Sequence, residues 1–237
     1  MKRFHHFLRD VRYASRSLRK TPGFAAAAIL TLALGIGANT AIFSVLEGVV
    51  LDPLPYHEPD RLVMVAVYNQ RLKYATMLSY PDFLDWQRSA HSFQQIAAFK
   101  TQGFDVAGPG MPEHVDGKEI SSSFFSTLGV KLALGRDFSA EEDRTGGMPA
   151  VIISYRLGQE RFAGSRSALG KAMILNGGDY TIVGVLQPGF RFGNEHADVY
   201  TPLARGDELY LKDRTVHNIL CIARLQPGVS VEQARAR

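Results

Sequence analysis

No residue from Phe24 to Leu46 is charged, and this apolar stretch limits the fold more strongly than any other feature of the sequence. About 20 helical residues cross the hydrocarbon core of a bilayer, so this stretch is long enough to span a membrane. Pro22 suits the first turn of a helix, and Pro53 and Pro55 would end that helix on the far side. We therefore predict a transmembrane helix over residues 22–51.

A cleavable signal peptide is the main alternative for the same stretch. Its apolar region would hold about 7–15 residues and would lead into a cleavage site of small residues. The stretch here is about twice as long. It continues into Val49-Val50-Leu51-Asp52, which contains no such site. The sequence favours an uncleaved membrane anchor.

The positive charge of the chain is confined to its first residues. Residues 1–21 contain seven lysines and arginines and one aspartate, whereas residues 52–237 contain 20 basic and 21 acidic side chains. The positive-inside rule then places the N-terminus in the cytoplasm and the residues after about 51 outside. A nucleic-acid-binding protein would carry its basic residues on the folded body, so we expect no nucleic-acid partner.

Two sets of side chains near the membrane are candidate contact sites. In residues 1–21, apolar side chains recur at helical spacing between basic ones, which predicts an amphipathic cytoplasmic helix on the lipid bilayer. The basic head of that helix contains Arg12, Arg16 and Arg19, which would contact lipid or a cytoplasmic partner. In the membrane segment, small residues four positions apart would let another helix pack closely. These small residues are Ala33, Gly37 and Ala41.

Residues 52–237 mix short strand patterns with helical ones, which predicts an α+β domain. Ser79 followed by Pro81 marks a helix start, and Asn176-Gly177 marks a hairpin because both residues readily take positive φ. We also predict a second unit over about residues 135–204. The expected strands include Leu62–Tyr68, Ile96–Phe99, Phe104–Ala107, His114–Ile120 and Ile219–Leu225.

The last predicted helix has barely begun when the sequence ends. Ser230 and Gln233 form a capping box, in which each side chain accepts a hydrogen bond from the other residue's backbone N–H. A helix of about two turns is marginal in water without tertiary packing. We therefore expect the domain over residues 52–237 to be C-terminally incomplete and weakly held after Pro227.

The sequence contains no pattern that carries catalysis. It has no Walker motif and no Gly-x-Ser-x-Gly elbow, and the histidines after the membrane segment show no metal-ligand spacing. Ser139 with Glu142 fits a helix cap better than a cation site, although Glu141 and Asp143 are also acidic. Cys221 lies in an apolar run and is expected to be a buried structural thiol. We predict no catalytic residue, no metal, no cofactor and no enzymatic activity.

Motifs along nearly the whole chain resemble one family of membrane proteins. The first lie at the membrane segment: Leu18-Arg19-Lys20-Thr21-Pro22-Gly23-Phe24, Leu30–Ser44 and Pro53-Leu54-Pro55-Tyr56. Further matches are Ser79–Trp86, Phe124–Val130, Leu134–Phe138, Tyr180–Val185 and Arg224–Val229. With these motifs the chain resembles the start of ABC-transporter permeases of the MacB/FtsX type, and among them the large duplicated permeases.

The resemblance implies a MacB-like periplasmic core domain, an α+β body in which a porter-like subdomain is interrupted by a second subdomain. It implies the bacterial inner membrane and a cytoplasmic ATP-binding subunit as partner. The other implied partners are further permease helices or a second permease copy, giving a dimer, and periplasmic or outer-membrane components. The family has no catalytic residue in the permease.

The leading hypothesis is a permease subunit, or an N-terminal fragment of one. It would couple the movement of a cytoplasmic ATPase to a periplasmic domain, for export or mechanotransmission. One alternative is a membrane-anchored periplasmic binding or signalling module without transport. A membrane-tethered hydrolase is a second alternative, disfavoured because no nucleophile–base set is visible.

Reporter fusions test the predicted orientation. Because the basic residues precede the apolar stretch, alkaline phosphatase fused after Pro55 should be active, since this enzyme works only outside the cytoplasm. Activity of a cytoplasm-only reporter at the same position would reverse the orientation.

Overall fold

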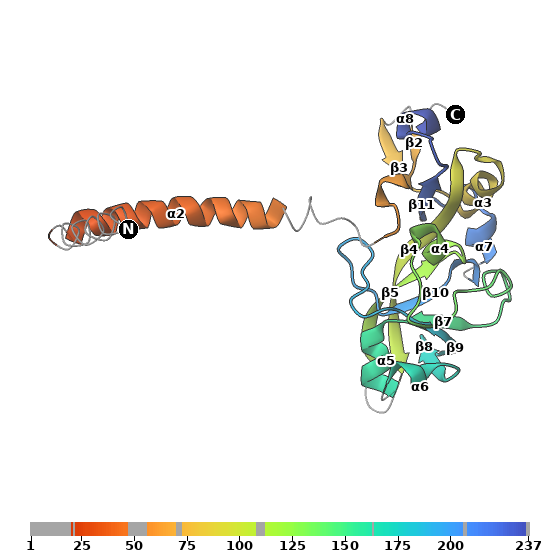
Figure 1. Ribbon diagram of the computed structural model, residues 1–237. Coiled ribbons are helices and arrows are strands. Elements are labelled where there is room, and N and C mark those ends of the chain that lie inside the picture. The colour runs from red at the N-terminus through yellow and green to blue at the C-terminus, as the bar shows by residue number, and fades with distance from the viewer. Residues whose placement is uncertain are drawn as a thin grey trace, which may run out of the picture. The chain divides into compact units, whose positions relative to one another are not determined.

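The computed structural model describes residues 20, 22–46, 56–69, 73–107, 112–162, 164–205 and 208–235. The chain divides into two compact units, Met1–Pro53 and Leu54–Arg237. Figure 1 shows the described part of the first unit as one long helix and the second unit as a sheet with short helices around it. Each unit is described by itself.

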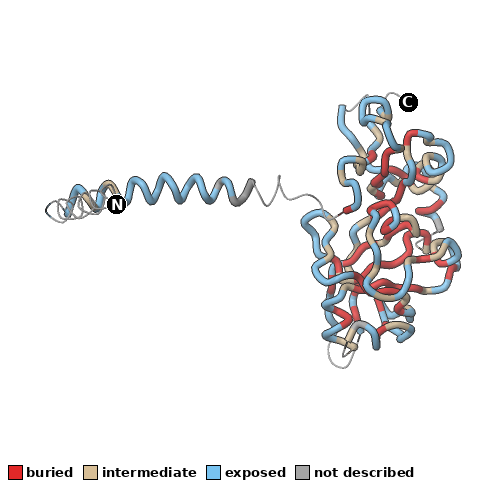
Figure 2. The backbone as a smooth tube through the Cα atoms, viewed as in Figure 1, coloured by how far each residue is buried: buried red, intermediate tan, exposed pale blue. Residues whose placement is uncertain are grey.

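Helix α2, Pro22–Leu46, is the described part of the first unit. Its window Pro22–Ala41 is long and apolar enough to cross a membrane, and no side chain of this window is buried. Figure 2 shows this exposure along the helix. At 1.5 Å per residue a helix of this length extends about 37 Å, more than the hydrocarbon core of a bilayer. The structure therefore confirms a helix over 22–46, while residues 47–51 of the predicted span lie outside the described residues.

The second unit is built on one nine-stranded sheet of order β1-β11-β4-β5-β10-β7-β9-β6, with β8 paired to β4 and β9. Mixed strands and helices confirm the predicted α+β class. The strands are β1 Leu62–Val65, β2 Val67–Asn69, β3 Tyr74–Thr76, β4 Phe93–Ala107, β5 Glu113–Ile120, β6 Leu134–Gly135, β7 Ala150–Ile153, β8 Ala172–Leu175, β9 Gly178–Val185, β10 Val199–Pro202 and β11 Leu220–Leu225.

Strand β4 corrects the predicted pair of strands Ile96–Phe99 and Phe104–Ala107, because it runs through both without a turn. Its first half pairs with β11, and from Phe99 to Val106 it pairs with β5. Gly103 is not a turn residue here. A Cβ at this position would lie 2.5 Å from Nε2 of His114, so glycine makes room for the histidine on the neighbouring strand.

The predicted local signals at helix and hairpin ends are confirmed. Ser79 caps α3 by accepting a hydrogen bond from the Asp82 amide at 3.3 Å. Asn176 and Gly177 join β8 to β9 with φ of 49° and 80°. The helices of the second unit are η2 Pro59–Arg61, α3 Tyr80–Ser89, α4 Phe124–Leu128, α5 Tyr155–Phe162, α6 Ser165–Ala168, η3 Leu203–Arg205, α7 Glu208–Lys212 and α8 Val231–Arg235.

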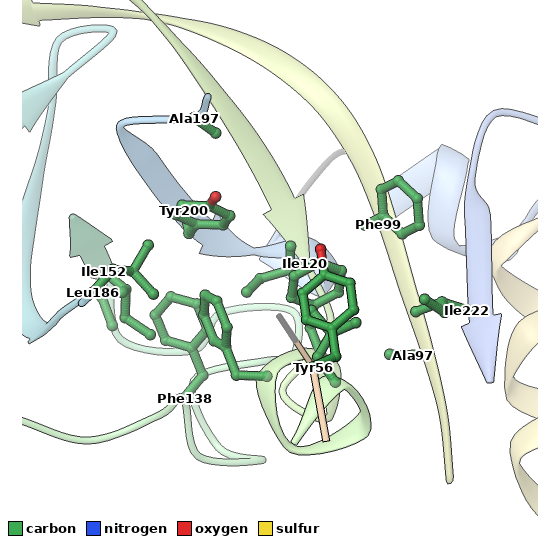
Figure 3. Packing of buried hydrophobic residues seen from close by; sticks show 14 residues of the cluster. Tyr56, Ala97, Phe99, Ile120, Phe138, Ile152, Leu186, Ala197, Tyr200 and Ile222 are labelled. Atoms are coloured by element: carbon green, nitrogen blue, oxygen red, sulfur yellow. The ribbon is translucent and has the colours of Figure 1, made fainter. Parts of the chain in front are cut away.

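The sheet of the second unit carries three buried clusters. One lies between α3 and the strands β1, β11 and the start of β4. A second contains residues of β4, β5, β7, β8, β9, β10 and α5. The largest includes the aromatic residues of α4, and its residues on β4, β7 and β11 alternate with those of the other two clusters, so it lies on the opposite face of the sheet. Figure 3 shows residues of this cluster. Since β10 pairs in parallel with β5, the predicted unit over 135–204 shares this sheet with the rest of the domain. Its boundaries stay a prediction.

The turn after β6 forms the predicted capping box without the predicted helix. Ser139 Oγ accepts from the Glu142 amide at 3.3 Å, and the Glu142 carboxylate accepts from the Ser139 amide at 2.8 Å. The two guanidinium nitrogens of Arg136 also bind this carboxylate, at 2.7 and 2.8 Å, which lowers the pKa of Glu142. The chain continues as a turn because glycines 146 and 147 follow, and glycine destabilises a helix interior.

Asp143 ties this turn to two other parts of the domain. Its carboxylate accepts from the amides of Ser122 at 2.7 Å, before α4, and of Ala204 at 3.0 Å, in η3. Burial, with a smaller contribution from the negative charge of Asp143, raises the pKa of the neighbouring Asp137 from 3.8 to about 6.

The raised pKa of Asp137 predicts a loss of stability with rising pH. Between about pH 4 and 6 the unfolded chain ionises this group while the folded chain keeps it protonated, so the stabilisation is complete below pH 4 and lost above 6. At pH 7, Asp137→Asn should raise the free energy of unfolding by about 2 kcal/mol. Denaturant unfolding at pH 4 and pH 7, followed by circular dichroism, would measure it. Parallel pH profiles of the two proteins would contradict the prediction.

Helix α8 is short and lies at the surface. Its capping box is confirmed, with Ser230 Oγ accepting from the Gln233 amide at 3.3 Å and the Gln233 side-chain oxygen accepting from the Ser230 amide at 3.0 Å. None of its residues is buried, and Val231 is 42% exposed.

We expect the amides of α8 to exchange with solvent much faster than those of the paired strand β9, because few contacts hold the helix. Hydrogen exchange followed by mass spectrometry measures both segments in one experiment. Equal protection of the two would show that α8 is fixed by packing.

Candidate functional site: the anchor segment and the cover loop

The first described residues after the membrane segment form an anchor segment, Tyr56–Arg61, which includes η2. Glu58 takes a left-handed conformation with φ 44°, and the Arg61 amide donates to the Glu58 carbonyl at 3.1 Å. Gly129, at the end of α4, packs so closely that an added Cβ would lie 2.6 Å from Cβ of His57. The backbone carbonyl groups of His57 and Glu58 in this turn need hydrogen-bond donors from other parts of the fold.

Arg224 of β11 supplies those donors. It is 5% exposed, and its guanidinium binds three backbone carbonyls. Nη2 donates to His57 at 2.6 Å, Nη1 to Glu58 at 3.2 Å, and Nε to Thr127 of α4 at 2.9 Å. Burial and the nearby Arg61 lower the pKa of Arg224. The planar guanidinium thus joins the anchor segment, α4 and β11 at one point.

Arg61 makes the reverse connection from the anchor segment to β11. Its Nε and Nη2 donate to the Leu225 carbonyl at 3.1 and 2.7 Å. Nη2 also donates to Oε1 of Gln94 on β4 at 2.6 Å, and Nη1 pairs with the Glu58 carboxylate. Arg224 reaches from β11 to the anchor segment, and Arg61 reaches from the anchor segment to β11. Together the two arginines fix the anchor segment to this strand.

Tyr56 joins the anchor segment to a second element, the cover loop Gln187–Ala197 between β9 and β10. The tyrosine is 8% exposed and lies in the largest buried cluster (Figure 3). Its hydroxyl donates to the Arg191 carbonyl at 3.0 Å and accepts from the Gly193 amide at 3.1 Å. Both bonds go to the backbone of the cover loop, so the loop and the anchor segment are held together.

Two phenylalanines of the cover loop pack against the core below it. The Phe192 ring lies edge-on to Phe99 and Phe124, with centroids 4.8 and 5.0 Å apart. Phe190 packs edge-on against Phe125 at 5.8 Å. Edge-to-face aromatic pairs of this kind add about 0.5–1.5 kcal/mol each beyond area burial. Hydrogen bonds and aromatic contacts of the cover loop therefore connect the anchor segment to the core of the sheet.

The contact residues predicted from sequence lie elsewhere. Ala33, Gly37 and Ala41 are exposed on α2, with no Cβ contact within 4 Å at Gly37. Their packing role stays a prediction. The predicted basic head, with Arg12, Arg16 and Arg19, lies outside the described residues.

The sequence patterns do not mark Arg224 or Tyr56 as functional residues. One signal for Arg224 was available, since it is the single charged residue in the strand Leu220–Leu225. A buried strand seldom carries an arginine unless the arginine is paired or hydrogen-bonded. Tyr56 had no comparable local signal, because its partners are 135 and 137 positions away.

Comparison with solved structures shows what the fold is similar to. A domain of a putative permease from Porphyromonas gingivalis matches with a TM-score of 0.58 and 20% identity, over 75% of this chain and 80% of that one. The periplasmic region of MacB from Actinobacillus actinomycetemcomitans gives 0.56 and 16%, over 74% and 79%. The extracellular domain of the noncanonic ABC-type transporter YknZ from Gram-positive bacteria gives 0.53 and 16%, over 74% and 87%.

No curated protein matches the sequence. The sequence profile of the MacB-like periplasmic core domain, in contrast, matches residues 25–237, which is most of the chain. This profile and the folds of the solved structures confirm the resemblance seen in the motifs. The profile and the apolar helix α2 together indicate an inner-membrane protein. The chain belongs to the family of MacB-like periplasmic core domain proteins, which are components of ABC-type permeases.

Proposed function

We propose that this chain couples the movement of a cytoplasmic ATP-binding subunit to its periplasmic domain, through the anchor segment. Its N-terminus would lie in the cytoplasm and the residues after about 51 in the periplasm. Export or mechanotransmission would be the outcome, and the chain itself would perform no catalysis. The residues Arg12, Arg16 and Arg19 would contact the bilayer or the ATP-binding subunit.

The membrane helix would pack against further permease helices or a second permease copy in a dimer. Small side chains let two helix backbones approach closely, and α2 presents three of them at a spacing of four. These are Ala33, Gly37 and Ala41. Periplasmic or outer-membrane components would extend the assembly beyond the domain.

One observation carries the proposal: the anchor segment is the first described part of the chain after α2, and side chains far away in sequence fix it to the domain. Arg224 reaches the His57 carbonyl across 167 positions, and Arg61 reaches the Leu225 carbonyl across 164. Charge-assisted hydrogen bonds contribute about 1.5–3 kcal/mol each, so local detachment of the segment is costly. A displacement of the anchor segment would therefore move β11 and the cover loop with it.

Hydrogen exchange in the assembled transporter tests this coupling. The full chain and its ATPase partner are placed in lipid nanodiscs and compared with and without trapping by ATP and vanadate. Trapping should change exchange in the anchor segment, in β11 and in the cover loop. Arg224→Met should reduce the change in β11 at least about threefold, because three charge-assisted hydrogen bonds are lost.

Arg214→Met is the matched control. Arg214 is 57% exposed and binds Asp82 and Asp85 on α3 at 2.6 and 2.7 Å, away from the anchor segment. This variant should respond to trapping like the unaltered protein, since exposed ion pairs contribute little. Circular dichroism establishes that both variants are folded. If trapping by ATP and vanadate did not change exchange in the domain of the unaltered protein, coupling would be contradicted and the binding or signalling module favoured.

A further inference from the structure

The cover loop shields a buried lysine of the sheet. Lys118 on β5 is 1% exposed, and its Nζ donates to Oγ1 of Thr101 at 3.3 Å. The ammonium lies 5.7 Å from the ring centroids of both Phe99 and Phe192. Its carboxylate partner is Glu195 of the cover loop, whose side chain is 63% exposed. A buried cation thus takes its counter-ion from a residue that faces solvent.

A second polar group lies beside this lysine without a partner. Tyr200 of β10 stands opposite Lys118 in the parallel register and is 0% exposed. Its hydroxyl has no hydrogen-bond partner within the described part of the chain. Burial raises the pKa of Tyr200, and the charges of Tyr56, Asp198 and Glu195 also raise it. An unsatisfied buried hydroxyl destabilises the fold, and a ligand that bonds to it would remove this cost.

The cover loop fills the space above these two groups with its own side chains. Phe192 packs on Phe99, and Phe190 lies 6.4 Å from the Tyr200 ring. Gly189 and Gly193 have φ of 74° and 61°, with open space where a Cβ would stand. If the loop moved away, two phenyl-sized spaces with aromatic walls would open next to the ammonium and the hydroxyl (Figure 3 shows Phe99 and Tyr200).

We propose that the space under the cover loop binds a small amphiphilic anion, with its acidic head on Lys118 and Tyr200 and its apolar body between the aromatic rings. The apolar body would be the size of the two phenyl rings it replaces. In this structure the Glu195 carboxylate occupies the position of the acidic head, and the rings of Phe190 and Phe192 occupy the position of the apolar body. Apolar walls with a few placed polar groups are typical of small-molecule sites. This inference does not depend on the coupling role.

Photolabelling of the full chain in nanodiscs tests the site with a defined probe. The probe is 4-benzoylbenzoate, a carboxylate on two aromatic rings that crosslinks on irradiation. We expect saturable labelling of peptides from β5, the cover loop and β10. Benzophenone, which lacks the carboxylate, should label them at least about threefold less, because the ion pair with Lys118 is missing.

Four variants separate binding from folding. Glu195→Gln removes the competing carboxylate and should raise labelling at least about threefold. Glu160→Gln, which breaks an exposed ion pair with Arg156 on α5, should leave it unchanged. Tyr200→Phe removes a hydroxyl without a described partner, so it should keep the fold and still lower labelling. Lys118→Met should abolish labelling. If that variant does not fold, labelling of the other three variants tests the proposal.

Two nanodisc compositions distinguish the source of the acidic head. In phosphatidylcholine alone, labelling by the free carboxylate should be strongest. If added phosphatidylglycerol competes, the natural ligand is a lipid headgroup, and if it does not, the ligand is a free amphiphile. Labelling that is absent from these peptides, equal with benzophenone, or indifferent to Glu195→Gln would overturn the proposal.

Discussion

Strand β4 is the element on which the rest of the domain depends. It bonds to β11 through its first residues and to β5 and β8 through its later ones, so a single strand runs beside all three buried clusters. Backbone groups in a sheet interior must be paired, and a continuous strand pairs them without an intervening turn. Gly103 permits this continuity, because the neighbouring His114 occupies the position where a Cβ would be. Figure 2 shows the buried residues gathered along this line.

The contacts of Arg224 follow from the same requirement that buried backbone groups be hydrogen-bonded. The anchor segment is too irregular to join the sheet ladder, so the carbonyls of His57 and Glu58 need side-chain donors. One guanidinium satisfies both of them and the Thr127 carbonyl of α4. The price is a buried cation, and the nearest described carboxylate, that of Glu58, lies 3.8 Å away. Because breaking these bonds would leave the cation buried and unpaired, the contacts of Arg224 resist local opening of the anchor segment.

The cover loop takes part both in the proposed coupling and in the proposed ligand site, through different residues. It bonds to Tyr56 at one point and to Lys118 at another, so displacement of the anchor segment and exchange of Glu195 for a ligand would act on the same loop. The carboxylate of Glu195 is largely exposed, whereas the ammonium of Lys118 is not. Because the Glu195 carboxylate is already largely hydrated, it loses little when the loop moves away from Lys118. The buried ammonium of Lys118 would then need another anion as its partner.

The sequence by itself determined the features that depend on neighbours in the chain. These are the apolar helix over 22–46, the cap at Ser79, the hairpin at Asn176-Gly177, the α+β class and the family resemblance. Tertiary structure alone decided the rest. The partners of Arg224 and Tyr56 lie more than 90 positions away, and nothing local specifies them. Lys118 looks like a surface residue in the sequence, but in the fold it is enclosed by side chains of β4 and of the cover loop. The capping box at Ser139 shows the same limit, because its side-chain bonds were predictable, while the turn that follows is held by contacts of Asp143 with α4 and η3.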